Sequence, residues 1–145
     1  MVRISSALLI LYALSSCTAR DPKLQQYVVQ GEQLYIKHCS NCHQKSGEGL
    51  GLVYPPVNQS DFIDTHQEEV ICLMRYGRQG ELVVNGKVYN QAMPANPLLT
   101  DLEIAEIATY LYNNWGRNRG LLEVTAVTRA LDACSETPQR TPAKE

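Results

Sequence analysis

The sequence has few aromatic residues and no dominant sign of charge. Of its 145 residues 7% are aromatic, with a single Phe and a single Trp, and the formal net charge is −2. No basic stripe is present that could neutralise phosphates, which argues against nucleic acid as a partner. The aromatic share predicts a core that is thin for this length, as expected where a buried cofactor fills part of the interior.

Patterns typical of catalytic centres are also missing. The sequence contains no nucleophile–base pair and no paired carboxylates that would suggest an enzyme. Three glycines lie in the loop 46–51, but the Lys-Ser/Thr pair and the strand–helix context of a phosphate-binding loop do not follow. The length predicts one domain with extensions, and no internal repeat divides it.

What the chain does contain is the run Cys39-Ser40-Asn41-Cys42-His43, placed where a predicted helix ends. This spacing is the attachment signal for c-type haem. Two cysteines three apart in a helical turn lie on one face, so both thiols can form thioether bonds to one macrocycle. His43 then brings a ring nitrogen to the iron. A single copy of the motif predicts one covalent haem c.

Two other uses of a Cys-x-x-Cys pair are less well supported. A structural zinc site needs a second ligand pair of similar spacing, and His66, Cys72 and Cys134 are scattered. A thioredoxin-like redox pair needs a βαβ context, which this sequence does not have.

The first 16 residues have the pattern of a lipoprotein signal peptide. The apolar stretch Ile4–Leu14, about 11 residues long, is too short to span a bilayer. The run Leu14-Ser15-Ser16-Cys17 that follows resembles a bacterial lipobox, in which the cysteine is lipidated; the alternative is an ordinary signal peptide with an incidental cysteine. Residues 17–25 are then a tether. Residue 18 is Thr rather than Asp, which in the enterobacterial sorting pattern for lipoproteins somewhat favours the outer membrane over the inner one.

Periodicity and capping signals predict the elements of the domain. The expected helices span residues 26–39, 66–76 with a Thr65/Glu68 capping box, 101–115 with a Thr100/Glu103 capping box, and 126–133 with a Thr125 cap. Asn85-Gly86 within residues 82–89 predicts a β-hairpin with a type I′ turn. Residues 117–134 are a C-terminal extension, and residues 135–145 are predicted to form a disordered tail.

Three side chains could occupy the second axial position of the iron. Met74 falls within an amphipathic helix, where methionine usually fills the core, and His66 lies in a solvated first turn. Met93 lies in a loop that Pro94 stiffens, just before the last long helix, so it can reach the opposite haem face. Met93 is therefore the predicted ligand, and an open or labile sixth site is the alternative.

Residues 26–116 resemble a class I, mono-haem cytochrome c, here in the form of a bacterial lipoprotein. The resemblance is carried by residues around the haem motif and in the last helix: Gly31, Tyr35, Pro55, Met93, Pro94, Ile107 and Tyr110. It implies an all-α cytochrome c fold in which the first and last helices cross at Gly31. It also implies that the Pro55 carbonyl accepts a hydrogen bond from His43.

The stretch from Val83 to Asn90 resembles a subgroup with a short β-hairpin inserted before the Met-ligand loop. Leu50, Val57 and Leu98 are candidates for haem packing by position. The chain departs from the family pattern in its lipobox and its extension. Cys72 is by default a buried hydrophobe, and a disulfide between Cys72 and Cys134 is a hypothesis that suits an exported protein.

The predicted function is a membrane-anchored electron carrier that is not an enzyme. Two strong-field ligands leave no site for a substrate, and thioether ligation by Met93 favours ferrous iron and raises the potential. The partners are other redox proteins, and the location is periplasm-facing. Two alternatives stay open: a haem subunit docked in a larger oxidoreductase (a dehydrogenase, nitrite reductase or terminal oxidase), and a ligand sensor with a labile sixth ligand.

Overall fold

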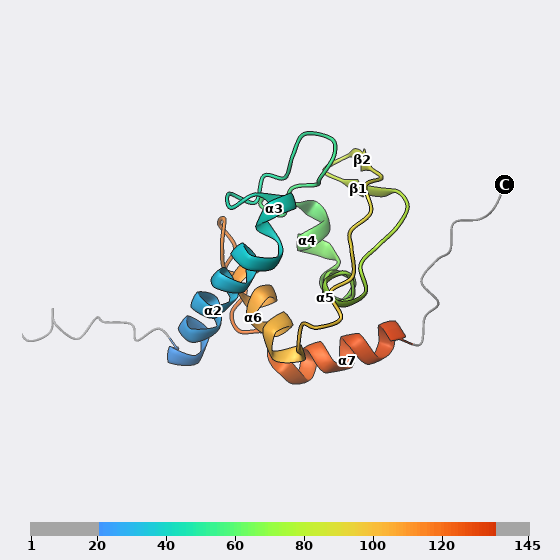
Figure 1. The fold of residues 1–145 in the computed structure, drawn as a ribbon. Helices are drawn as coiled ribbons and strands as arrows, with labels where there is room; N and C mark the ends of the chain where they lie inside the picture. Colours follow the sequence, from blue (N-terminus) through green and yellow to red (C-terminus); the bar gives the residue numbers. More distant parts are fainter. Residues whose placement is uncertain (1–20, 136–145) are drawn as a thin grey trace, which may run out of the picture.

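The computed structural model describes residues 21–135 (Figure 1), so the predicted signal peptide, Cys17 and the tail beyond residue 135 lie outside the described residues. The elements in chain order are α2 (Pro22–His38), α3 (Ser40–His43), α4 (Asp61–Thr65), α5 (Gln67–Tyr76), β1 (Leu82–Val84), β2 (Lys87–Tyr89), α6 (Asp101–Leu111) and α7 (Val124–Ser135). The architecture is mainly helical with one antiparallel strand pair. Among the described residues no helix is both long and apolar enough to cross a membrane.

Helices α2 and α6 cross at the centre of the fold. Gly31 of α2 lies against the backbone of α6, and a Cβ built at Gly31 would overlap the carbonyl oxygen of Glu106. The side chains of Tyr35, Tyr110 and Trp115 pack beside this crossing, with ring centroids 5.4 to 5.7 Å apart. The crossing therefore requires glycine, as the resemblance implied, and it supports the end of α2 that carries the haem motif.

The first helix begins at Pro22, inside the stretch predicted as a tether. The Asp21 side chain accepts a hydrogen bond from Lys23 N (2.9 Å), and Pro22 occupies a first-turn position where its missing N–H leaves no bond unmade. Lys23 Nζ also pairs with Glu123 Oε2 at 2.7 Å, which ties the start of α2 to the segment before α7.

The predicted capping box of Thr65 and Glu68 is wrong. Thr65 is the last residue of α4, and its hydroxyl donates to that helix's own backbone at 2.7 Å. His66 holds the N-cap position of α5 without a side-chain cap bond. The cap in this region is Ser60, whose hydroxyl accepts from Ile63 N at the start of α4. A four-residue motif cannot tell which of two adjoining short helices it would open.

The predicted hairpin forms and is fastened to α4 at its turn. Asn85 and Gly86 both have positive φ, 51° and 71°, as a type I′ turn requires. Asn85 N donates to Asp61 Oδ1 (2.7 Å), and Asp61 N donates to Asn85 Oδ1 (3.0 Å). Asn85 Nδ2 also donates to Gln59 O (3.0 Å). These bonds supply the support that two isolated strands lack.

The boundaries of the last two helices differ from the prediction. The Thr100/Glu103 capping box at the start of α6 is confirmed. However, α6 ends at Leu111, because the chain then turns and Trp115 has a φ of 50°. Helix α7 begins at Val124, so Thr125 lies inside the helix rather than capping it.

Helix α7 packs against α5 and α6 and buries a stripe formed by Val127, Ala130 and Leu131. A disulfide joins Cys72 of α5 to Cys134 of α7, with their Cα atoms 6.0 Å apart. This is the pairing that the sequence suggested, and it fixes the C-terminal extension to the domain.

Candidate haem-binding site

An apolar cavity in two adjoining lobes lies among the loops and helices of the domain. The space free of atoms measures about 580 Å³ in one lobe and about 500 Å³ in the other, including the part that is open to solvent. Five of the lining residues are shared by both lobes: His43, Pro55, Leu73, Leu82 and Met93. The predicted axial ligands therefore share one cavity although they are far apart in the sequence.

His43, at the end of α3, is held in a single orientation. Its Nδ1 lies 2.9 Å from the carbonyl oxygen of Pro55. A carbonyl can only accept, so Nδ1 carries the proton and donates it to this bond, which leaves Nε2 with a free lone pair. Burial lowers the pKa of the imidazole, although the bond to Pro55 opposes this, and the neutral ring is the form that binds a metal.

Cys39 and Cys42 have free thiols and line different lobes of the cavity. The turn that carries them is fixed by backbone bonds: Cys42 N and His43 N both donate to Cys39 O, at 3.2 and 3.0 Å. Burial, with the neighbouring Cys42 thiol, raises the pKa of Cys39 to about 12. Both cysteines are thus positioned at the same cavity as His43, as thioether attachment requires.

Met93 is held in the cavity wall through its backbone. Met93 N donates to Arg78 O and Arg78 N donates to Met93 O, each at 2.9 Å. The close approach depends on Gly77, which has a φ of 70° and where a Cβ would lie 2.5 Å from Met93 O and 2.6 Å from Ala95 N. The sequence predicts only that a helix ends at residue 76. No local pattern indicates that the next residue, Gly77, holds the loop that carries Met93 (residues 90–100, the Met loop).

The two rival ligands occupy different surroundings. Met74 is buried on α5 and lines one lobe, together with the helix residues around it. His66 is exposed, stacks on Phe62 with ring centroids 4.5 Å apart, and lines neither lobe. Met93 is the methionine that lines both lobes.

Of the three predicted packing residues, Val57 is buried and lines the cavity, whereas Leu50 and Leu98 do not. Leu98 is 88% exposed, because the chain turns before α6 so that its neighbour Leu99 enters the core instead. Leu50 is 52% exposed, at the start of a tight turn that directs Tyr54 rather than Leu50 to the cavity. The predictions for Leu50 and Leu98 are therefore wrong.

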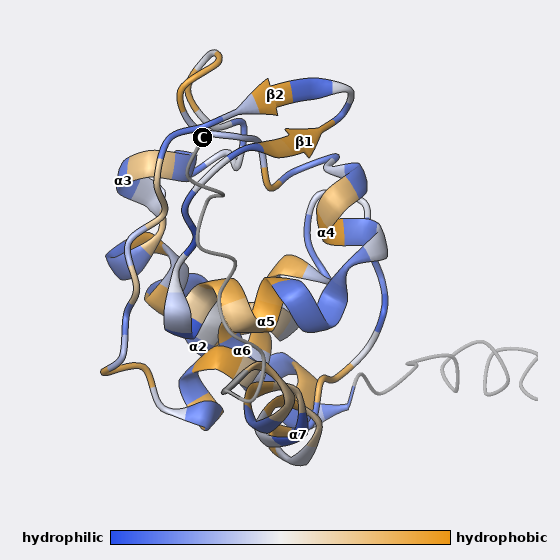
Figure 2. Ribbon diagram, turned by 90° about the vertical axis from the view of Figure 1, so that its right-hand side faces the viewer, coloured by the Kyte–Doolittle hydropathy of each residue, from blue (hydrophilic) through white to orange (hydrophobic). Residues whose placement is uncertain are grey.

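The remaining wall is apolar and comes mainly from helices and the hairpin. Its apolar members on helices and in the hairpin that the sequence did not single out include Phe62, Ile63, Val70, Leu73, Leu82, Val84 and Leu111. Figure 2 shows α6 and the adjoining part of α5 as largely hydrophobic. Helical periodicity marks such positions as core, but it does not distinguish a residue that faces protein from one that faces a cofactor.

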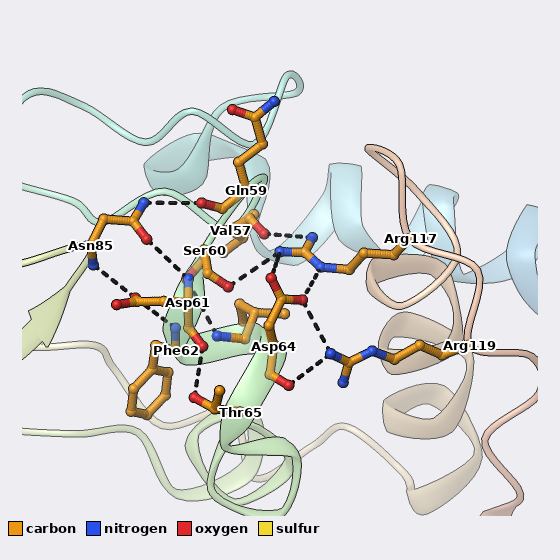
Figure 3. A network of polar contacts seen from close by, with 11 residues as sticks. Val57, Gln59, Ser60, Asp61, Phe62, Asp64, Thr65, Asn85, Arg117 and Arg119 are labelled. Carbon is orange, nitrogen blue, oxygen red and sulfur yellow. Dashed lines mark hydrogen bonds and ion pairs between the residues drawn. The ribbon is translucent and has the colours of Figure 1, made fainter.

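A polar network outside the cavity fixes the loop that carries Val57 and Ser60 (Figure 3). The guanidinium of Arg117, whose side chain is 7% exposed, donates to Val57 O (3.0 Å), Ser60 O (3.4 Å) and Asp64 Oδ1 (2.6 Å). Arg119 donates to Asp64 O (2.7 Å) and contacts the same carboxylate. Val57 and Ser60 line the cavity, so a segment that follows α6 holds the wall beside Pro55. No sequence pattern announces such a long-range contact.

These residues fit a covalently bound haem. Two free thiols, a neutral imidazole with Nε2 free and a thioether side chain line one apolar cavity. Within residues 21–135 no group of three or more His, Cys, Asp or Glu side chains is arranged to hold a bare metal ion. The site suits iron that is held within a macrocycle.

Comparisons with known proteins agree with this chemistry. Residues 27–111 match the family model described as cytochrome c oxidase, cbb3-type, subunit III. Cytochrome c-552 of Thermus thermophilus is 30% identical over 118 residues, which cover 76% of this chain and 89% of that protein. A second cytochrome c-552 of the same species is also 30% identical, with 79% of its length covered. The cytochrome c subunit of the quinone alcohol dehydrogenase of Gluconobacter oxydans is 25% identical over 61% of this chain and 19% of its own length.

The match to the family model spans both predicted axial ligands and both cysteines of the haem motif. It also covers the crossing of α2 with α6, and it ends at residue 111, the last residue of α6, before the C-terminal extension. The chain therefore belongs to the cytochrome c family, whose members bind haem c covalently.

Proposed function

We propose that this protein carries single electrons between redox partners through one haem c whose iron is ligated by His43 and Met93. The observation that carries the proposal is that these two side chains line both lobes of one cavity, with His43 Nε2 free. The bound haem supplies a one-electron ferric/ferrous couple. Two protein ligands leave no position for a substrate, so the protein is not an enzyme.

The residues of the chain set the conditions for this couple. The Pro55 carbonyl fixes the orientation of His43 and raises its basicity as a ligand. The backbone pair between Arg78 and Met93 holds the thioether side of the site. The apolar lining excludes water, and thioether ligation favours the ferrous state, so we expect a high midpoint potential.

The test is a reduced-minus-oxidised spectrum of the holoprotein with and without Met93→Ala. We expect a low-spin haem whose methionine–iron charge-transfer band is lost in this variant. Met74→Leu is the matched control, since it removes the other methionine that lines the cavity while keeping the packing, and it retains the band. A band that survives in Met93→Ala and disappears in Met74→Leu would refute the ligand assignment.

A second candidate is a haem subunit docked in a larger oxidoreductase. The similarity to a cytochrome c subunit of an alcohol dehydrogenase supports it. The hairpin, which we infer to be an insertion before the Met loop, and α7 are the candidate surfaces for contact with that enzyme. Co-purification of a dehydrogenase, nitrite reductase or oxidase from detergent-solubilised membranes distinguishes a subunit from a free carrier. A ready spectral shift on adding carbon monoxide to the reduced protein would instead favour a ligand sensor.

We also propose that the protein is exported, faces the periplasm and is anchored to a membrane, with the outer membrane somewhat favoured. The support is the lipobox-like run that ends at Cys17 and the export that haem c attachment requires. Mass spectrometry of the mature N-terminus tests this by detecting acyl chains on Cys17. Recovery of the Cys17→Ser protein in the membrane fraction would contradict the anchor.

A further inference from the structure

Helix α7 lies outside the stretch that matches the family model, which ends at residue 111. It is nevertheless joined to the domain by more than apolar contact. The disulfide from Cys72 to Cys134 links its last turn to α5. Thr128 Oγ1 donates to Asp101 Oδ2 (2.6 Å), and Tyr76 Oη donates to Leu131 O (3.4 Å).

The two sides of α5 have different neighbours. Cys72 and Tyr76 contact α7, and α5 packs more extensively on α7 than on α6. Leu73 and Met74, from the same turns, line the haem cavity. The N-terminus of α5 has no side-chain cap, so this ten-residue helix depends on tertiary contacts for its position.

The Met loop is attached to the end of α5. Asn96 N donates to Arg75 O (3.1 Å), and the reciprocal backbone bonds join Met93 to Arg78. Between these two anchors, Gly77 lies directly against Met93 O. The position of Met93 is therefore set by the C-terminal turn of α5, and a shift of this turn moves the methionine with it.

We propose that the Cys72–Cys134 disulfide is a positioning device for Met93. This disulfide clamp holds α5 against α7. When haem is bound, it would keep the thioether of Met93 at the iron, so that external ligands are excluded from that position. A dithiol reductant opens the clamp: the S–S bond accepts two electrons and two protons, two thiols form, and the reductant becomes a disulfide. The inference rests on the proposed function, because it needs Met93 as the axial ligand.

The experiment is an imidazole titration of the ferric holoprotein, in the wild type and in the double variant Cys72→Ala/Cys134→Ala. Imidazole binds only when Met93 has left the iron, so its apparent affinity reports the population of the open state. We expect the double variant to bind imidazole roughly tenfold or more tightly than the wild type, with a weaker methionine–iron band, because the constraint on α5 is lost.

Tyr27→Ala is the control for a general loss of stability. Tyr27 is buried on α2 and does not line the cavity, so at a temperature equally far below its own Tm this variant binds imidazole as the wild type does. If the double variant fails to fold, the folded wild type is treated with a phosphine reductant, alkylated, reoxidised with ferricyanide and titrated.

The outcomes separate the two proposals. A wild-type band with unchanged imidazole affinity after loss of the disulfide would overturn the clamp alone. A wild type that lacks the methionine–iron band would overturn the ligand assignment and the clamp together. An equal gain of affinity in Tyr27→Ala would also overturn the clamp, since any destabilisation would then release Met93.

Discussion

The two sides of the haem site are built in different ways. His43 is positioned by neighbours close in sequence: the turn from Cys39 and the carbonyl of Pro55. Met93 is positioned by Arg78, by Gly77 and, through α5, by a disulfide to α7. The histidine side is therefore largely a property of one short segment, whereas the methionine side is a property of the tertiary structure. Perturbations of distant residues should act on Met93 before they act on His43.

The largest effect is expected for His43→Ala, which removes the side chain proposed to bind the iron on the histidine side. Without the imidazole the iron loses the ligand that follows the attachment cysteines, so we expect covalent haem content to fall by at least about tenfold. A haemochrome assay on purified protein measures it. Near-normal content of a low-spin haem in this variant would mean that another side chain replaces His43. The histidine side would then not be a property of one short segment.

Gly77→Ala is expected to break the methionine side while leaving the histidine side intact. The added Cβ meets the Met93 carbonyl oxygen and the Ala95 nitrogen at a φ of 70°, so we expect a loss of about 2–4 kcal/mol of unfolding free energy and loss of the methionine–iron band. Chemical denaturation and absorption spectra measure the two effects.

Gly120→Ala is the matched control for this substitution. Gly120 also has a positive φ, 78°, but no atom lies within 4 Å of a Cβ built there, and it lines neither lobe of the cavity. The substitution strains the backbone without a steric clash, so it should lower the unfolding free energy by about 1–2 kcal/mol and keep the band. If Gly120→Ala also loses the band, backbone strain rather than contact with Met93 is the cause.

Arg117→Gln tests a long-range support on the histidine side. Removing a buried guanidinium leaves the carbonyls of Val57 and Ser60 without this donor, which should cost about 2–3 kcal/mol. Arg119→Gln is the control, since Arg119 shares Asp64 but its side chain is 38% exposed; it should cost less than about 1 kcal/mol. Urea unfolding measures both changes. Equal losses of unfolding free energy in the two variants would show that the two arginines act only through Asp64.

The smallest effect concerns pH and the contacts that Asp101 of α6 makes with α5 and α7. A hydrogen bond from Thr128, aided by Arg75, lowers the pKa of Asp101 below its ordinary value of 3.8. Because the folded pKa is depressed, this stabilisation is complete above about pH 4 and is lost as the pH falls through the folded pKa. The carboxylate is partly exposed, so the contribution is roughly 0.5–1 kcal/mol. Asp101→Asn should flatten that part of the acid unfolding curve, and an unchanged curve would refute the assignment.

This difference between the two sides also explains how much the sequence could predict. The haem motif, the Pro55 contact and the Thr100/Glu103 cap depend on local or family patterns, and the structure contains each of them. The roles of Gly77 and Arg117 come from approaches between segments that no local pattern encodes. Leu98 was misplaced for a related reason: one residue of offset in a turn decides whether Leu98 or Leu99 faces inward.

The disulfide has a consequence for the covalent topology of the chain. It closes a loop across a sequence separation of 62 that contains Met93, the hairpin and α6, but not the haem motif. In the loop-entropy model, closing such a loop raises the free energy of the unfolded chain by about 4 kcal/mol, because the chain loses conformational entropy. Cys39 and Cys42, the proposed sites of the thioether bonds to haem c, lie outside this loop. Each of the two proposed axial ligands thus belongs to a segment with its own cross-link, and on this proposal the two cross-linked segments meet at the haem iron.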